Sequence, residues 1–408
     1  MTQRSIRAIT GGLAACLCLT GCTAGGGAVS SREGSSSGTA GSTTGSVAVS
    51  EPTVTDASEP APDTTSVTST YPQTEKPRVT KPTAPQTTTR RPTAATTTLA
   101  SASTTAPQTT VPPRDRVGFG YYRMGDPKSG ALEEMEKEAA KGHINTYQLS
   151  MAPYNFQDTL TQLEKVKELN GMAWLGIAET IFIFAQSDDP RYGYKVSQIA
   201  GWQDSLADMM DEIRSRDLMD SVLGFYFDEP LLCGVRRNDF RDVTGALRQT
   251  YPALRVMAVF AVSAITPEIW TTGHEPLDPD TARYLTDAGY DMYGAINEGS
   301  RATYLRVNAD LKKRLGREDV RIWYVPAIMN YLGDKDQKYA IDHLCAMLEF
   351  LEGEKNPGGL LCYAYDISNH DGIGNIGYKE MRDREKNPWS TLEEWVIYTG
   401  KKVLAMQP

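Results

Sequence analysis

The sequence contains few of the residues that build metal centres or disulfide scaffolds. Its 408 residues include only six cysteines and four histidines. Cys16, Cys18 and Cys22 lie near the N-terminus, and neither the remaining cysteines nor the histidines show the spacing of a metal site. We therefore expect no metal site and no disulfide framework.

The P-loop motif of nucleotide-binding proteins and the serine hydrolase elbow are also missing. The chain has no GxxxxGK[ST] phosphate loop, and residues 116–408 contain no GxSxG elbow. We expect no cofactor and no Ser-His-Asp hydrolysis. Residues 116–408 hold 33 of the 42 Lys and Arg and 44 of the 51 Asp and Glu, a formal charge of −11. An acidic body without a basic cluster argues against nucleic acid as a partner.

The N-terminus has the pattern of an export signal. Residues 1–7 are short and basic, and residues 8–19 are apolar but too few to form a stable membrane span. The sequence Leu-Thr-Gly-Cys then ends at Cys22 and resembles the bacterial lipobox, in which the signal peptide is cut before a cysteine that carries diacylglycerol. The resemblance implies a signal peptide over residues 1–21 and a bacterial surface protein anchored to the membrane by lipid. An ordinary secretory signal with a chance cysteine is the alternative.

Residues 22–115 form a segment rich in Ser, Thr, Pro, Gly and Ala, with few large apolar side chains. Such a composition buries too little surface to offset the entropy of ordering, so we expect a disordered tether. Its prolines favour an extended spacer that carries the following domain away from the membrane. Residues 116–408 are then a single globular domain of ordinary composition.

In this domain, strand-like runs alternate with helical patterns eight times. The predicted strands are 117–122, 144–151, 172–178, 222–227, 254–262, 290–296, 320–328 and 359–367. The helix expected after the fifth strand covers 278–289, and a longer connection follows the third strand. Eight such units predict an α/β fold of the (β/α)8 TIM-barrel type. An open doubly wound sheet is the competing fold, but it rarely needs eight regular units.

The active site of a TIM barrel lies at the carboxyl ends of its strands. Polar and aromatic side chains gather at the predicted strand ends, and they are our candidates for catalysis or substrate binding. They are Tyr122, Arg123, Tyr147, Gln148, Glu179, Asp228, Glu229, Asp291, Tyr293, Asn297, Asn330, Tyr331, Asp366 and Asn369.

The fourth strand ends in SVLGFYFDEP, so that a buried run meets two adjacent carboxylates, Asp228 and Glu229. Simple pleating points neighbouring residues to opposite faces, but a turn of the backbone at the strand end can bring both acids into the cleft. Their repulsion then separates their pKa values, which leaves one as a proton donor and the other ionised. Glycoside hydrolysis needs that division of labour. Alternatively, the pair merely begins a helix.

The motif GFYFDEP resembles the fourth-strand acids of barrel glycoside hydrolases. One large retaining clan has Asn-Glu-Pro there, but it also needs a glutamate nucleophile on strand seven, and VRIWYVPAIMNY has no carboxylate. Hexosaminidase-type barrels, with adjacent Asp-Glu, and chitinase-like barrels, with Asp-x-Glu, are more similar. In these families the N-acetyl group of the substrate is the nucleophile. The resemblance implies Glu229 as acid/base and Asp228 as its helper.

Two further stretches resemble the chitinase-like barrels. YDMYGAI is similar to their sixth strand, which implies that Asp291 and Tyr293 contact sugar, and GGLLCYAYDIS is similar to their eighth strand.

We therefore expect a surface-anchored glycoside hydrolase with a carbohydrate substrate. Two alternatives stay open: a non-catalytic carbohydrate-binding lipoprotein on a barrel scaffold, and an inverting hydrolase. The inverting enzyme would pair Glu229 with a distant carboxylate, which is Asp366, Asp291 or Glu179.

Overall fold

The computed structural model describes the domain but little of what precedes it. The described residues are 113–122, 124, 130–186, 194–268, 275–293, 298–329, 337–366, 377–383 and 390–406. The predicted signal peptide, Cys22 and nearly all of the predicted tether lie outside these ranges. No helix within them combines the length and apolar character needed to cross a membrane.

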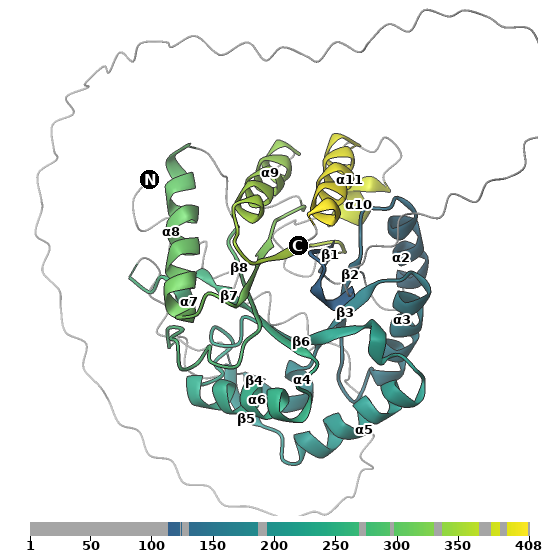
Figure 1. Cartoon of the computed structure of the whole chain (residues 1–408), viewed down its shortest axis with the longest axis vertical. Coiled ribbons are helices and arrows are strands. Elements are labelled where there is room, and N and C mark those ends of the chain that lie inside the picture. Colours follow the sequence, from purple (N-terminus) through teal and green to yellow (C-terminus); the bar gives the residue numbers. More distant parts are fainter. Residues whose placement is uncertain are drawn as a thin grey trace, which may run out of the picture. The chain divides into compact units, whose positions relative to one another are not determined.

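Eight parallel strands close into a barrel, which confirms the predicted (β/α)8 fold (Figure 1). The strands follow one another around the barrel in chain order, and β10 pairs with β1 to close it. The barrel strands are β1 (Gly118–Tyr121), β2 (Thr146–Ser150), β3 (Met172–Gly176), β6 (Val222–Asp228), β7 (Arg255–Ala261), β8 (Asp287–Asp291), β9 (Arg321–Val325) and β10 (Pro357–Cys362).

Helices surround the strands, with the long ones on the outside of the barrel in Figure 1. The helices are α2 (Ala131–Ala140), α3 (Phe156–Glu168), α4 (Ala178–Ile181), α5 (Trp202–Ser215), α6 (Arg237–Thr250), α7 (Val262–Ile265), α8 (Glu298–Leu315), α9 (Lys338–Glu352), α10 (Tyr378–Arg382) and α11 (Ser390–Ala405). Short 3-10 helices cover Pro113–Asp115 (η1) and Met219–Ser221 (η3). The long connection predicted after the third strand contains an antiparallel hairpin of β4 (Phe182–Gln186) and β5 (Tyr194–Gln198).

The helix predicted over 278–289 is wrong. Turns occupy 279–284, and the sixth barrel strand, β8, already begins at Asp287. The side chain of Asp278 accepts hydrogen bonds from both the backbone N–H and the hydroxyl of Thr281, at 2.8 and 2.6 Å. These local bonds give the backbone an alternative to helix. The strand therefore ends at Asp291, rather than beginning just before it.

The strands separate two hydrophobic layers. The layer between strands and helices is the larger and contains side chains such as Phe119, Tyr147 and Phe225. The barrel interior holds a second cluster, in which the rings of Trp174 and Trp323 meet edge to face with centroids 5.8 Å apart. The interior is thus packed with side chains, and a substrate can enter only at an end of the barrel.

Polar contacts close the amino end of the barrel. The buried carboxylate of Asp287 accepts a hydrogen bond from Trp323 at 2.7 Å and forms an ion pair with Arg255, also at 2.7 Å. Arg255 also donates to the backbone oxygen of Arg114 at 2.9 Å, and Arg114 donates to the backbone oxygen of Met219 at 2.7 Å. The segment that enters the domain at residue 113 is therefore fixed across this end, and the opposite end is left for a ligand.

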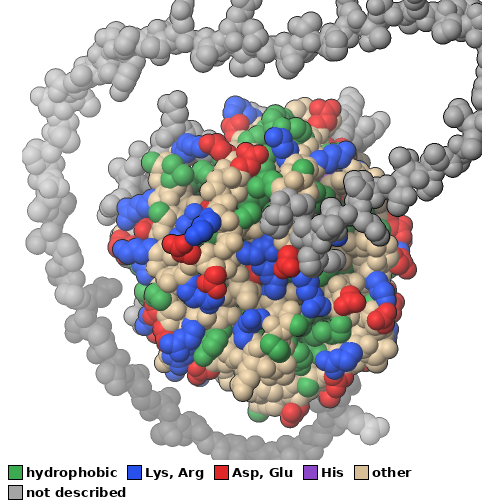
Figure 2. Space-filling view, in the orientation of Figure 1, with side chains coloured by type: hydrophobic (Ala, Val, Ile, Leu, Met, Phe, Trp, Pro, Cys, Tyr) green, Lys and Arg blue, Asp and Glu red, His purple; other side chains and the backbone are tan. Residues whose placement is uncertain are grey.

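Charges of both signs are interspersed on the face of the molecule shown in Figure 2. Exposed ion pairs of the domain include Arg241 with Asp280 at 2.6 Å and Arg216 with Glu212 at 2.7 Å. Exposed pairs of this kind contribute little stability, typically under about 1 kcal/mol.

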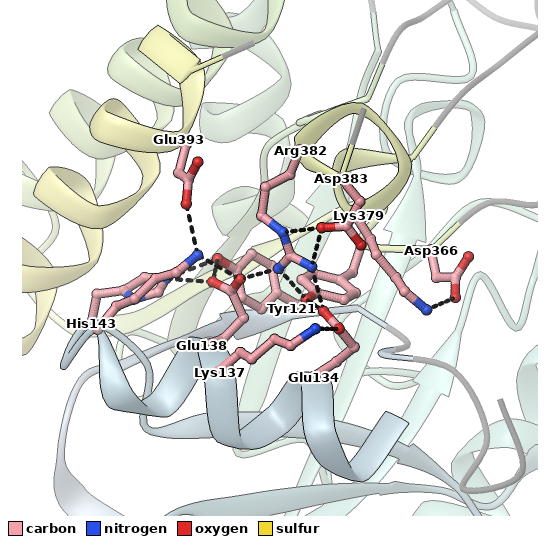
Figure 3. A network of polar contacts seen from close by, with 12 residues as sticks. Tyr121, Glu134, Lys137, Glu138, His143, Asp366, Lys379, Arg382, Asp383 and Glu393 are labelled. Carbon is pink, nitrogen blue, oxygen red and sulfur yellow. Dashed lines mark hydrogen bonds and ion pairs between the residues drawn. The ribbon is translucent and has the colours of Figure 1, made fainter. Parts of the chain in front are cut away.

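A buried ionic network outside the barrel joins the first helix of the domain to its last ones. Figure 3 shows Arg382 of α10 between Glu134 and Glu138 of α2, and its guanidinium contacts each carboxylate at 2.5 Å. Lys141, just after α2, bridges Glu138 and Glu393 of α11 at 2.8 and 2.9 Å. These contacts attach α10 and α11 to α2 across more than two hundred residues of sequence.

Hydrogen bonds inside this network keep its most buried acid ionised. Burial acts to raise the pKa of Glu138, but hydrogen bonds and charge from His143 and Lys141 lower that pKa to about 2. Tyr121 of β1 donates to the same carboxylate at 2.9 Å. Because Glu138 is fully buried, its charge depends on every one of these partners.

We predict that Arg382→Ala lowers the free energy of unfolding by about 3–5 kcal/mol, because it leaves two buried carboxylates without their shared cation. Urea denaturation at neutral pH measures the loss. The matched control is Arg306→Ala, since Arg306 is 54% exposed and forms only a surface pair with Asp310. This control is expected to change stability by at most about 0.5 kcal/mol. Equal losses of unfolding free energy in the two variants would show that the buried network stabilises the protein no more than a surface ion pair does.

Candidate active site

Three carboxylates meet at the carboxyl end of the barrel. Asp228 is the last residue of β6, Glu229 follows it, and Asp291 is the last residue of β8. Only β7 lies between these two strands, and its residues Val259 and Ala261 pair with Asp228 and Asp291. All three acids therefore lie at the same rim of the barrel, on strands separated by one neighbour.

The backbone turns sharply at Glu229, so that the alternation of an extended strand ends there. Its φ is +39°, in the left-handed region that side chains other than glycine seldom adopt. Its N–H still pairs with Val259 oxygen at 2.9 Å, as a strand residue would, while its own oxygen accepts from Cys233 at 2.9 Å. Such a conformation costs about 1–3 kcal/mol and persists only where the surroundings hold it in place.

The turn brings both neighbouring acids toward Asp291. The charges of Asp228 and Asp291 both act on the Glu229 carboxyl, which is only 4% exposed. The next helix, α6, begins at Arg237, so the acid pair does not start a helix. The alternative in which these acids cap a helix is therefore excluded.

Burial and mutual repulsion raise the pKa values of this group. Burial is the largest cause for Glu229, and the charges of Asp291 and Asp228 add to it, so the Glu229 pKa lies well above its usual range. Burial and the charge of Asp228 raise the pKa of Asp291 to about 7, against hydrogen bonds from Glu229 and Tyr293 that lower it. Because two carboxyl groups can share a hydrogen bond only if one is protonated, Glu229 and Asp291 together retain a proton near neutral pH.

One carboxyl oxygen of Glu229 and one of Asp291 lack a hydrogen-bond partner among the described residues. Within the described part of the chain, Glu229 Oε2 and Asp291 Oδ1 are buried and have no hydrogen-bond partner. An unpaired buried carboxylate oxygen is costly, and native proteins rarely leave one without a function. These atoms are the strongest indication that a ligand or solvent completes the site.

Tyrosines surround the three acids. The Tyr226 hydroxyl lies 2.9 Å from the Tyr122 hydroxyl and 3.3 Å from Asp228 Oδ1, and it can donate its one proton to either of them. The rings of Tyr293 and Tyr363 stack with centroids 5.3 Å apart, and Tyr122 meets Tyr363 edge to face at 5.5 Å. Burial, and then the charge of Asp291, raise the pKa of Tyr293 well above its usual range, so its hydroxyl stays a donor. The site thus combines an acidic centre with aromatic and hydroxyl groups.

The structure brings some of the predicted site residues together around the three acids, but not all of them. Tyr122, Asp228, Glu229, Asp291 and Tyr293 come together as described. Tyr363 was not among the candidates, although its position just beyond β10 could have suggested it.

Four of the other candidates have different neighbours. Tyr147 packs in the layer between strands and helices. Gln148 is buried beside Gly176, and its Oε1 has no partner in the described chain. Glu179 lies in α4 and accepts a hydrogen bond from Tyr154. Asp366 contacts Lys379 at 3.4 Å, at a cavity of about 380 Å³ that it lines with Lys379, Glu380 and Asp383.

Other candidates cannot be located. Arg123, Asn297, Asn330, Tyr331, Asn369 and the lipidation candidate Cys22 lie outside the described residues. Among the residues that the structure does describe, no group of three His, Cys, Asp or Glu side chains is arranged to hold a metal ion.

No protein-family model matches the sequence, and no curated protein matches it. Solved structures with a similar barrel include glycoside hydrolases. An exo-β-1,4-mannosidase from an Opitutaceae bacterium is 12% identical over 71% of this chain and 60% of its own, with a TM-score of 0.48. An active domain of a chitinase from Pyrococcus furiosus is 12% identical over 72% and 96%, with a TM-score of 0.41. This chain thus spans about 60% of the mannosidase, and likenesses this weak carry no argument about function.

We predict that Glu229→Gln raises the melting temperature of the protein at pH 8 and has little effect at pH 4. The folded-state pKa of Glu229 is raised, so its ionisation opposes folding once the pH exceeds the unfolded pKa of about 4.3. The amide cannot ionise, and it can still donate to Asp291. Thermal unfolding at pH 4, 6 and 8 measures the effect, which should grow with pH.

Glu136→Gln is the control for this experiment, because the Glu136 side chain is 55% exposed on α2. Its effect on the melting temperature should depend little on pH over this range. A uniform decrease for Glu229→Gln at all three pH values would contradict the electrostatics described for the site.

Proposed function

We propose that the protein is a glycoside hydrolase in which Glu229 is the acid/base. The observation that carries the proposal is a buried glutamate with a raised pKa and a free oxygen, beside two further carboxylates. A carboxyl group that stays protonated near neutral pH can give its proton to the oxygen of a leaving sugar. Anionic carboxylates beside it stabilise the positive charge that develops on the sugar ring. The aromatic rings around the acids suit the apolar faces of pyranoses.

The mechanism that fits best uses the 2-acetamido group of the substrate. Its carbonyl oxygen attacks the anomeric carbon while the glycosidic C–O bond breaks and Glu229 protonates the leaving oxygen. Asp228 orients the acetamido group, and the hydroxyl of Tyr293 is placed to donate to it or to a sugar hydroxyl. Water then attacks the anomeric carbon and breaks its bond to the acetamido oxygen, which regenerates the acetamido group, and the water gives its proton to the Glu229 carboxylate, which restores the enzyme.

Two observations favour this mechanism over its competitors. No carboxylate follows β9 through Met329, so the described chain offers no nucleophile on the seventh strand. Glu229 and Asp291 share a hydrogen bond, whereas the two acids of an inverting enzyme stand about 6.5–9.5 Å apart to hold a water between them. Asp291 is therefore a poor partner for an inverting reaction with Glu229.

We predict that Glu229→Gln lowers kcat on aryl 2-acetamido glycosides by about 10²–10⁴-fold, because it removes the general acid. Initial rates on a panel of aryl glycosides measure the loss, with Glu136→Gln as the matched control of unchanged activity. Wild-type activity should also fall as the pH rises through the range in which the Glu229–Asp291 pair loses its proton. Sugar binding by the wild type without turnover of any glycoside would instead favour the non-catalytic carbohydrate-binding lipoprotein.

We also propose that the barrel works at a bacterial cell surface, held to the membrane by lipid on Cys22. The lipobox-like sequence and the composition of residues 22–115 support this placement. We predict that bacteria fed radiolabelled palmitate incorporate the label into the full-length protein and that Cys22→Ala abolishes the labelling. Cys16→Ala, inside the predicted signal peptide, is the control and should retain it. Equal labelling of both variants would contradict lipidation at Cys22.

A further inference from the structure

One aromatic ring at the open end of the barrel is exposed yet fixed. Tyr154 lies in the loop between β2 and α3, and 61% of its surface is accessible to solvent. Its hydroxyl donates a hydrogen bond to Glu179 Oε2 in α4, the short helix that follows β3. Both residues follow the carboxyl ends of their strands, so they lie at the same end of the barrel as Glu229.

The segments that carry Tyr154 and Glu179 are held by hydrogen bonds to the barrel. Met151 donates from its backbone to the Gly176 oxygen at 2.8 Å, and the Thr180 hydroxyl donates to the Met151 oxygen at 2.9 Å. The side chain of Asn155 accepts from the Ala152 backbone at 2.8 Å. The ring therefore presents a preorganised surface, and little side-chain entropy is lost when a ligand covers it.

This surface is close to the three acids but separate from them. β2, β3 and β6 are consecutive in the barrel, so β2 and β6 are two strand spacings apart, about 10 Å. The backbone of Ile177, just before α4, donates to the oxygen of Tyr226, whose hydroxyl contacts Asp228. The segment that carries Glu179 is thus bonded to the strand that carries Asp228.

The chemistry of the pair suits a sugar ring. An exposed tyrosine ring offers a flat apolar face for the C–H groups of a pyranose, and the adjacent carboxylate accepts hydrogen bonds from its hydroxyls. Ile183, at the start of the neighbouring hairpin, is also 53% exposed and adds apolar surface after α4.

We propose that Tyr154 and Glu179 bind a sugar unit of the substrate outside the catalytic cleft, so that the substrate is an oligomer of acetamido sugars rather than a single glycoside. The inference rests on the proposed hydrolase function, because it places the scissile bond at Glu229. It adds a second contact point, which makes the length of the chain a determinant of specificity.

The test compares substrates of different length in the full-length protein. For the wild type, kcat/KM on β-1,4-linked N-acetylglucosamine oligomers should rise from two to six units. Tyr154→Ala should remove most of that rise, about 3- to 15-fold on the longest oligomer, and leave the rate on the aryl monoglycoside unchanged. Tyr154→Phe, which keeps the ring but loses the bond to Glu179, should have an intermediate effect. Tyr398→Ala is the control, since Tyr398 is 49% exposed on α11.

Binding to Glu229→Gln, measured by calorimetry with the same oligomers, separates this inference from the proposed function. Weaker binding of long oligomers by Tyr154→Ala in that background supports the inference even if the wild type hydrolyses nothing. Hydrolysis by the wild type with no effect of Tyr154→Ala on any oligomer overturns the inference alone. Equal losses on the monoglycoside and the hexamer, or no binding of these oligomers at all, also overturn it.

Discussion

The confinement of three carboxylates at the carboxyl end of one barrel is the constraint on which the site depends. Water would let Asp228, Glu229 and Asp291 ionise independently, but burial and proximity force two of them to share a proton. The fold has to hold that arrangement against its own electrostatic cost. A packed interior of tryptophan and tyrosine lies below the acids, and it must also offset the cost of the strained backbone at Glu229.

The stability of the domain comes from elsewhere in the molecule. The large hydrophobic layer between strands and helices, and the ionic network between α2, α10 and α11, both lie outside the barrel. Charge is used in opposite ways in the two places. In the network each buried carboxylate has cations beside it and stays ionised, whereas the charges that act on Glu229 are themselves negative. Because the stabilising contacts are separate from the acids, the repulsion among the acids can lower the stability of the protein without unfolding it.

Sequence patterns predict the architecture well, because eight alternations of strand and helix have few other solutions. They also place Asp228 and Glu229, since a hydrophobic run that ends in acids marks the carboxyl end of a strand. They fail where a local bond competes with periodicity, as Asp278 and Thr281 do in replacing a helix with turns.

Long-range geometry is the other part that the sequence does not reveal. Nothing in the sequence indicates that Glu229 bonds to Asp291, or that Arg382 pairs with an acid 248 residues away. Strand alternation does predict that two neighbouring candidates cannot both line the barrel interior. Tyr147 and Gln148 are neighbours in β2, so only one of them can face the barrel interior, and the structure places Tyr147 on the helix side.

The closure of the amino end has a consequence for access to the mouth of the barrel. The polypeptide enters the domain at residue 113 beside Arg255 and Met219, at the base of the barrel, whereas the acids lie at the mouth. The first described residues therefore lie at the end of the barrel opposite the acids. The mouth is left clear by these first residues, so a ligand of any length can reach the acids without passing them.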